Sequence, residues 1–299
     1  MPHPMLPTTA PGEVLLVGTA HPDSERAGWY RAPELPGWRW EGEVLAFGGG
    51  GVRLRAVRNP QWENLRGGNI PALVPAGSRA PVVALVDASV VYADAGLLLI
   101  DVREVPGRGV RVPAESLEHV LTGLVTELLH FDDLVRGMDR CGYYQGDGGA
   151  PRNPTPTAVV RTSLPQLPTA GATLLVRTDF ADTHGWDKLL DRLGELDDEN
   201  EVNLDFEFDG DEVPFHARVV DDRAFESLQP GQVPALVPAG ERPTIVALAD
   251  SVALADPELP LLVVDLYHAP GQSLRIPYAE AGSMVGNLEI ANMDFFEFG

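Results

Sequence analysis

Cysteine is almost absent from this chain of 299 residues. Cys141 is the only one, so an internal disulfide is impossible and a cysteine-rich zinc site is excluded. Long apolar runs are missing too, because the longest aliphatic runs, 97–100 and 261–264, fall far short of the roughly 20 residues of a membrane-spanning helix. The N-terminus lacks the basic start and apolar stretch of a secretory signal. These absences predict a cytoplasmic protein with no membrane partner.

Positive charge is scarce as well. The chain has 22 Lys and Arg against 44 Asp and Glu, a formal net charge of −22. Residues 1–150 carry 18 acids and 13 bases, a net of −5, whereas residues 151–299 carry 26 acids and 9 bases, a net of −17. Such a field repels nucleic acid and anionic membranes and attracts cationic partners, although solubility alone is an alternative explanation.

The chain is a tandem repeat. Segments 69–87 and 232–250 are identical at 12 of 19 positions at a constant offset of 163. Shorter matches extend the repeat in both directions, pairing 12–19 with 171–178, 98–101 with 262–265, and 111–113 with 275–277. Each copy is long enough for its own core, which argues for two domains rather than a solenoid.

The predicted domain limits follow from this repeat. A divergent first copy spans 6–140, a Pro- and Gly-rich linker spans 141–166, and the second copy spans 167–299. Both copies mix strands with helices, which predicts an α/β or α+β fold with a mixed sheet and flanking helices.

Several local patterns predict individual elements. Apolar residues at helical spacing over 182–193 predict a helix, and a similar stripe that ends on Leu128 predicts the last helix of the first copy. The alternation in 204–208 predicts the first strand of a hairpin. The Pro-Gly pairs 106–107 and 270–271 predict turns.

Three aspartates of the second copy close or follow short apolar strands, namely Asp179, Asp250 and Asp265. Ligands bind at the carboxyl ends of strands in open α/β sheets, and carboxylates there can hold Mg²⁺. These three are therefore candidate metal ligands. Aspartate is also a common turn residue, which is the structural alternative. No other cofactor is predicted, and no catalytic residues are predicted because no triad or paired-histidine motif is visible.

Two further groups of residues are singled out. Arg177, Asn292 and Asp294 are predicted to form a polar cluster with Asp179, in which an Arg–Asp pair joins the last helix to the first strand. The densest run of acids is the predicted surface for a cationic protein, and its candidate contact residues are Asp197, Asp198, Glu199 and Glu201.

The second copy carries the sequences Arg177-Thr178-Asp179-Phe180 and NLEIANMDFFEF at 287–298, with Trp186 and LVVDL at 262–266 between them. In these features it resembles an actinobacterial family of uncharacterised α/β domains. The resemblance covers 167–299 and reaches 6–135 only through the repeat, where the motif is altered. It implies the fold and a bacterial cytosolic setting, and it implies no activity.

The leading hypothesis is a non-enzymatic, acidic two-domain binding protein, such as an immunity, inhibitor or adaptor protein for a cationic protein partner. A divalent-metal-dependent enzyme or small-ligand-binding domain that uses the three aspartates is one alternative. A structural component of a bacterial assembly is another. No oligomeric state is predicted.

Overall fold

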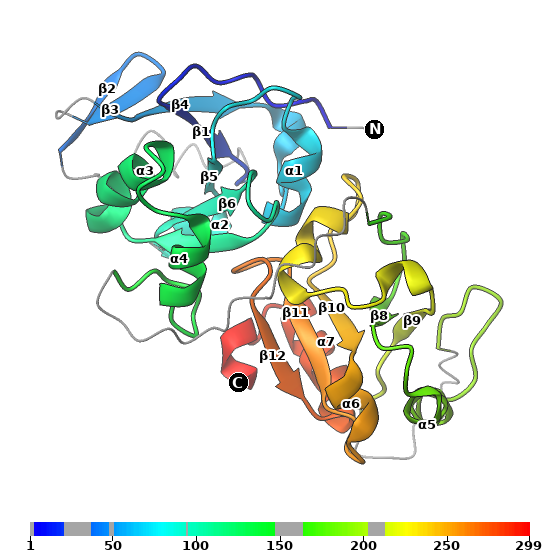
Figure 1. Cartoon of the computed structure of the whole chain (residues 1–299). Coiled ribbons are helices and arrows are strands. Elements are labelled where there is room, and N and C mark those ends of the chain that lie inside the picture. Colours follow the sequence, from blue (N-terminus) through cyan, green and yellow to red (C-terminus); the bar gives the residue numbers. More distant parts are fainter. Residues whose placement is uncertain (1–2, 21–36, 48–50, 94, 147–163, 203–212) are drawn as a thin grey trace. The chain divides into compact units, whose positions relative to one another are not determined.

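The computed structural model of the chain describes residues 3–20, 37–47, 51–93, 95–146, 164–202 and 213–299. The chain divides into two compact units, one built chiefly from residues 1–155 and the other chiefly from 156–299 (Figure 1). Each unit holds one copy of the repeat. Within the described ranges, no helix is long and apolar enough to cross a membrane.

A seven-stranded mixed sheet forms the centre of the first unit, in the order β2-β3-β4-β1-β5-β6-β7 (Figure 1). Strand β1 pairs in parallel with β4 and β5, whereas the outer pairs on both flanks are antiparallel. The strands are β1 (Glu13–Gly18), β2 (Trp38–Glu41), β3 (Val44–Phe47), β4 (Arg53–Arg58), β5 (Val82–Val86), β6 (Leu97–Asp101) and β7 (Gly109–Val112). The helices are α1 (Ile70–Leu73), α2 (Ala88–Ala93), α3 (Leu117–Val125) and α4 (Phe131–Gly137), with short 3-10 helices η2 (Pro60–Trp62), η3 (Gly67–Asn69) and η4 (Ala114–Ser116).

The second unit has a five-stranded sheet in the order β12-β11-β10-β8-β9. Its strands β9-β8-β10-β11-β12 repeat the strands β4-β1-β5-β6-β7 of the first sheet. Strand β8 is parallel to β9 and β10, and β11 and β12 are antiparallel additions. The strands are β8 (Thr173–Arg177), β9 (Ala217–Val220), β10 (Ile245–Ala249), β11 (Leu261–Asp265) and β12 (Ser273–Ile276). The helices are α5 (Thr183–Leu193), α6 (Ser251–Ala255) and α7 (Tyr278–Glu289), with η5 (Arg223–Phe225), η6 (Pro230–Gln232), η7 (Pro234–Leu236) and η8 (Phe295–Phe298). Both units confirm the predicted mixed-sheet class.

The central strands of each sheet are buried on both faces. In β1, Val14 and Leu16 join the core formed with α3 and α4, whereas Leu15 and Val17 join the core formed with α1 and η2. Strand β8 divides its side chains between two cores in the same way. Burial of both faces explains why these strands are continuous apolar runs in the sequence.

Several elements predicted from local sequence signals are confirmed. Helix α5 begins after Asp182, whose side chain accepts a hydrogen bond from the Gly185 N–H at 2.8 Å. Both predicted Pro-Gly turns form, and Gly107 and Gly271 have φ values of +99° and +88°, which glycine adopts without a steric penalty.

Other local predictions need correction. Helix α3 ends at Val125, and Glu127 then has a φ of +62°, so Leu128 leaves the apolar stripe and is 82% exposed. The predicted strand at 204–208 lies outside the described residues. The folded part of the first unit also extends past residue 140, because Tyr143 forms a parallel bridge with Arg111 of β7.

Candidate functional site

The three aspartates predicted as metal ligands do not meet. Asp179 and Asp250 follow β8 and β10, which run in parallel and end at the same edge of the sheet. Strand β11 runs antiparallel to β10, and its register places Asp265 opposite Ile245, at the far end of β10. Five residues of strand span about 17 Å, several times the length of a metal–oxygen bond. Strand direction therefore separates Asp265 from the other two, and the predicted shared site does not form.

Asp265 instead holds the turn between β11 and β12. Its carboxylate accepts hydrogen bonds from the N–H groups of Tyr267, His268 and Ala269, at 2.8, 3.2 and 2.6 Å. Asp101 organises the equivalent turn of the first unit, where it accepts three backbone N–H bonds at 2.8 to 2.9 Å. The aspartate side chain is fully buried in both turns, where it accepts hydrogen bonds from backbone N–H groups and so stabilises the turn.

Asp250 is also occupied internally. Its Oδ1 accepts a hydrogen bond from the Ala253 N–H at the start of α6, and both of its oxygens pair with Arg275 of β12. Within the described ranges, no group of three or more His, Cys, Asp or Glu side chains could hold a metal ion. The strand-end carboxylates therefore stabilise turns, helix starts and strands.

Within the predicted polar cluster, Arg177 forms its ion pair with a different residue from the one expected. The Arg177 guanidinium pairs with Asp221, at 3.3 Å, and not with Asp294. Asp221 directly follows β9, and because β8 and β9 run in parallel, the ends of the two strands bring these residues together. Asp221 also accepts a hydrogen bond from the Trp186 Nε1–H at 3.1 Å. The pair thus joins two neighbouring strands to α5.

Aromatic rings complete the surroundings of Arg177. The centre of its guanidinium lies 4.5 Å from the Phe180 ring centroid and 5.0 Å from that of Trp186. Its side chain is only 8% exposed, so little of the guanidinium is available to a ligand. The Arg177 Nε–H donates to the backbone carbonyl of Asp179 at 2.9 Å, whereas the Asp179 carboxylate accepts the Ala181 N–H.

The other two members of the predicted cluster act locally. Asn292 donates a side-chain hydrogen bond to Asn287 at 2.7 Å, just after α7 ends. Asp294 begins η8, and its backbone N–H donates to Glu297 at 2.7 Å. These bonds shape the C-terminal turn, and neither Asn292 nor Asp294 contacts Arg177 as the sequence predicted.

The acidic loop, defined here as residues 195–201, is anchored to the outer edge of β9. The Val202 N–H donates to the Ala217 carbonyl, and the Val219 N–H donates to the Asn200 carbonyl, both at 2.8 Å. Asp197 shapes the loop, since its Oδ1 accepts the N–H groups of Glu199 and Glu201.

Three other carboxylates of the acidic loop do not take part in shaping it. Asp198 and Glu199 are exposed and Glu201 is half-buried. None of these three carboxylate groups makes an ion pair or hydrogen bond with another described residue. The loop therefore presents carboxylates on a backbone that Asp197 holds in place.

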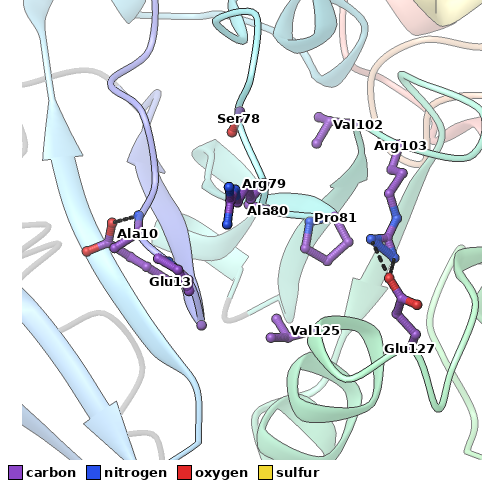
Figure 2. Close-up of a pocket in the computed structure, with 12 residues that line it drawn as sticks. Ala10, Glu13, Ser78, Arg79, Ala80, Pro81, Val102, Arg103, Val125 and Glu127 are labelled. Carbon is purple, nitrogen blue, oxygen red and sulfur yellow. Dashed lines mark hydrogen bonds and ion pairs between the residues drawn. The ribbon is translucent and has the colours of Figure 1, made fainter.

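Figure 2 shows a pocket of about 500 Å³ in the first unit. It lies at the start of β1 and β5, beside the end of β6 and the residues that follow α3. Its lining comprises Ala10, Pro11, Gly12, Glu13, Ser78, Arg79, Ala80, Pro81, Val102, Arg103, Val125 and Glu127. The volume falls in the range of small-ligand pockets. None of these residues stands out as a site in the sequence, because the lining comes from four separate segments without a common motif.

Most charges of this pocket neutralise one another. Both terminal nitrogens of Arg103 donate to Glu127 Oε1, at 3.1 and 3.0 Å (Figure 2). Glu13 pairs with Arg55 at 3.3 Å. Arg79, in contrast, has no ion pair or hydrogen bond with another described residue, and its side chain is exposed. Among the described residues, the pocket therefore offers the exposed guanidinium of Arg79, which suits weak recognition of an anion.

One titratable group of the first unit is clearly perturbed. Burial raises the pKa of Tyr143 above its ordinary value of 10.0, and the nearby Asp87 raises it further, against the opposing effect of Arg111. This tyrosine lies beside β7, so the perturbation marks a covered sheet edge.

Comparison with known proteins identifies the domain. No curated protein and no solved structure matches the chain. The family described as "Domain of unknown function (DUF6924)" matches two segments, residues 13–147 and 172–299. These segments correspond to the two units, which confirms the predicted duplication of an uncharacterised domain. Because the matches cover most of its length, the chain belongs to the DUF6924 family and carries that domain twice.

Proposed function

We propose that this protein is a non-catalytic binding protein whose acidic loop receives a cationic protein, in the manner of an inhibitor, immunity protein or adaptor. One observation carries the proposal. The carboxylates of the strand-end aspartates of the second unit are engaged in internal contacts, whereas those of Asp198, Glu199 and Glu201 in the acidic loop contact no other described residue through a hydrogen bond or ion pair.

The charge distribution supports the same reading. The second half of the chain has a net charge of −17, against −5 for the first half, so the long-range field is strongest around the unit that carries the loop. A negative field steers a cationic partner toward the protein and raises the association rate more than it slows dissociation. Because the loop backbone is held by Asp197, binding orders few additional residues.

The test is a triple variant, Asp198→Asn, Glu199→Gln and Glu201→Gln, which leaves Asp197 and hence the turn intact. The full chain is tagged and used to capture proteins from the lysate of its source cell, and captured proteins are identified by mass. A basic partner held by the wild type is then used in surface plasmon resonance. We expect the partner to associate with the triple variant roughly tenfold more slowly than with the wild type at low salt, and this rate to depend less steeply on salt.

A matched control variant has the same total charge as the loop triple variant. Glu258→Gln, Glu280→Gln and Glu289→Gln remove three exposed carboxylates of the same unit that lie outside the loop. The control triple should bind the partner at close to the wild-type rate. Equal association rates for the wild type and the loop triple would refute the proposal.

A further inference from the structure

The two units treat the same sheet edge differently. Strands β7 and β12 are the last strands of their sheets, and both pair with the preceding strand in the same register, with Arg111 opposite Leu98 and Arg275 opposite Leu262. Each arginine also reaches past the middle strand to the aspartate that follows the next strand, Asp87 or Asp250. The local structure is thus the same in both copies.

In the first unit, a short extended segment covers the edge of β7. The Arg111 N–H donates to the Gly142 carbonyl, and the Tyr144 N–H donates to the Arg111 carbonyl, both at 2.9 Å. The bridge between Arg111 and Tyr143 is parallel. Tyr144 is buried in the core with α3 and α4. Arg111 has no exposed surface as a result.

In the second unit, no described residue pairs with the equivalent edge. The backbone N–H and carbonyl of Arg275 make no hydrogen bond on the outer side of β12 with any described residue. Because the register matches that of Arg111, both groups point away from β11. The Arg275 side chain is 34% exposed and that of Asp250 is 23% exposed, although their ion pair is the same as in the first unit.

We propose that the edge of β12 at Arg275 binds an extended peptide segment of a partner protein by strand addition. The first unit indicates the chemistry of the occupant, which is a glycine followed by two aromatic residues that runs parallel to the strand. One aromatic residue would lie over the Asp250–Arg275 pair, as Tyr143 lies beside the Asp87–Arg111 pair. Main-chain hydrogen bonds would supply affinity and the aromatic side chains specificity.

This surface is separate from the acidic loop. The acidic loop borders β9, and β12 lies at the opposite edge of the five-stranded sheet, four strand spacings or about 19 Å away. The inference therefore does not rest on the proposed function, and either one can fail without the other.

The experiment uses a labelled synthetic peptide with the sequence of residues 138–146, in which serine replaces Cys141, and the full chain. The edge of β7 is already occupied by this segment, so we expect the added peptide to bind at the β12 edge, and exchange at the Arg275 amide reports whether that edge is the one filled. We expect saturable binding by fluorescence anisotropy, together with slower hydrogen exchange at the Arg275 amide. A peptide with alanine in place of Tyr143 and Tyr144 should bind at least about tenfold more weakly.

Two substitutions at one position separate strand addition from a side-chain contact. Arg275→Pro removes the outward N–H, which the ladder with β11 does not use, and proline is tolerated on an edge strand with this orientation. Arg275→Ala keeps the N–H and removes the guanidinium. We expect the proline variant to lose at least about tenfold in affinity and the alanine variant about threefold.

The exchange measurement needs no variant, so it stays decisive even if Arg275→Pro unfolds. The proposal is overturned if the wild type does not bind the peptide, if saturating peptide leaves exchange at the Arg275 amide unchanged, or if the folded proline and alanine variants bind equally well.

Discussion

Asp87 and Arg111 form a two-pronged ion pair, with 2.7 Å between Oδ2 and Nη2 and 3.3 Å between Oδ1 and Nη1. Asp250 and Arg275 form the same pair in the second unit. The side chain of Arg111 is 1% exposed, however, whereas that of Arg275 is 34% exposed. The protein therefore contains one contact in two environments, which allows the effect of burial to be measured within a single chain.

Replacement of the aspartate should cost more in the first unit. Asp87→Ala leaves the Arg111 charge buried without its partner, and we expect a loss of about 3–5 kcal/mol in the free energy of unfolding. Asp250→Ala leaves a partly solvated charge, and its expected cost is about 1–2 kcal/mol, mainly from the cap of α6. Urea unfolding of the full chain, followed by circular dichroism, measures both.

Both aspartates also accept an N–H at the start of a short helix, so the loss of a cap is common to the two variants. The difference between them therefore reports the burial of the pair. Equal losses would mean that the covering segment 142–144 does not strengthen the pair in the first unit.

Asp265→Ala should loosen the turn after β11. The variant loses three hydrogen bonds from backbone N–H groups to a buried carboxylate, for which we expect a destabilisation of about 2–4 kcal/mol. The amides of Tyr267, His268 and Ala269 should exchange hydrogen faster than in the wild type. Asp256→Ala is a suitable control, because that exposed carboxylate accepts only the Glu258 N–H. A smaller loss for Asp265→Ala than for the control would contradict the assigned role.

Two helical glycines should respond in opposite directions to alanine. A Cβ at Gly185 of α5 would lie 2.3 Å from the carbonyl oxygen of Leu254, so Gly185→Ala forces α5 and α6 apart despite its better helix propensity. A Cβ at Gly286 of α7 would meet nothing within 4 Å. We expect Gly185→Ala to lower the melting temperature and Gly286→Ala to add about 0.5–1 kcal/mol of stability. A stabilised Gly185→Ala variant would show that the two helices are not packed this closely.

Tyr143 should make stability fall at high pH. Its pKa is raised above 10.0 in the folded protein, so the folded state holds the phenolic proton more tightly than the unfolded state does. Its contribution is complete below pH 10 and is lost as the pH rises through the raised pKa. Tyr143→Phe should remove this part of the decline, measured as the free energy of unfolding at successive alkaline pH values. Parallel curves for the two proteins would refute the prediction.

Much of the fold could be predicted from the sequence because its signals are local. The duplication follows from identity at a constant offset, and the start of α5 follows from Asp182 and the apolar spacing after it. The two Pro-Gly turns follow from the conformational freedom of glycine. The repeat also pairs Asp250 and Arg275 with Asp87 and Arg111 of the first copy. Nothing in the sequence of either copy, however, shows that the aspartate and the arginine are in contact.

The sequence by itself determined that this is an acidic protein with a duplicated domain that mixes strands and helices, and where several of its turns and helices begin. Only the tertiary structure decided which polar residues meet. The antiparallel direction of β11 carried Asp265 away from Asp250, and the parallel pairing of β8 with β9 gave Arg177 its partner Asp221. Strand direction and register are set by packing between distant segments. Local patterns therefore do not show that residues 142–144 pair with the edge of β7, nor that no described residue pairs with the edge of β12 at Arg275.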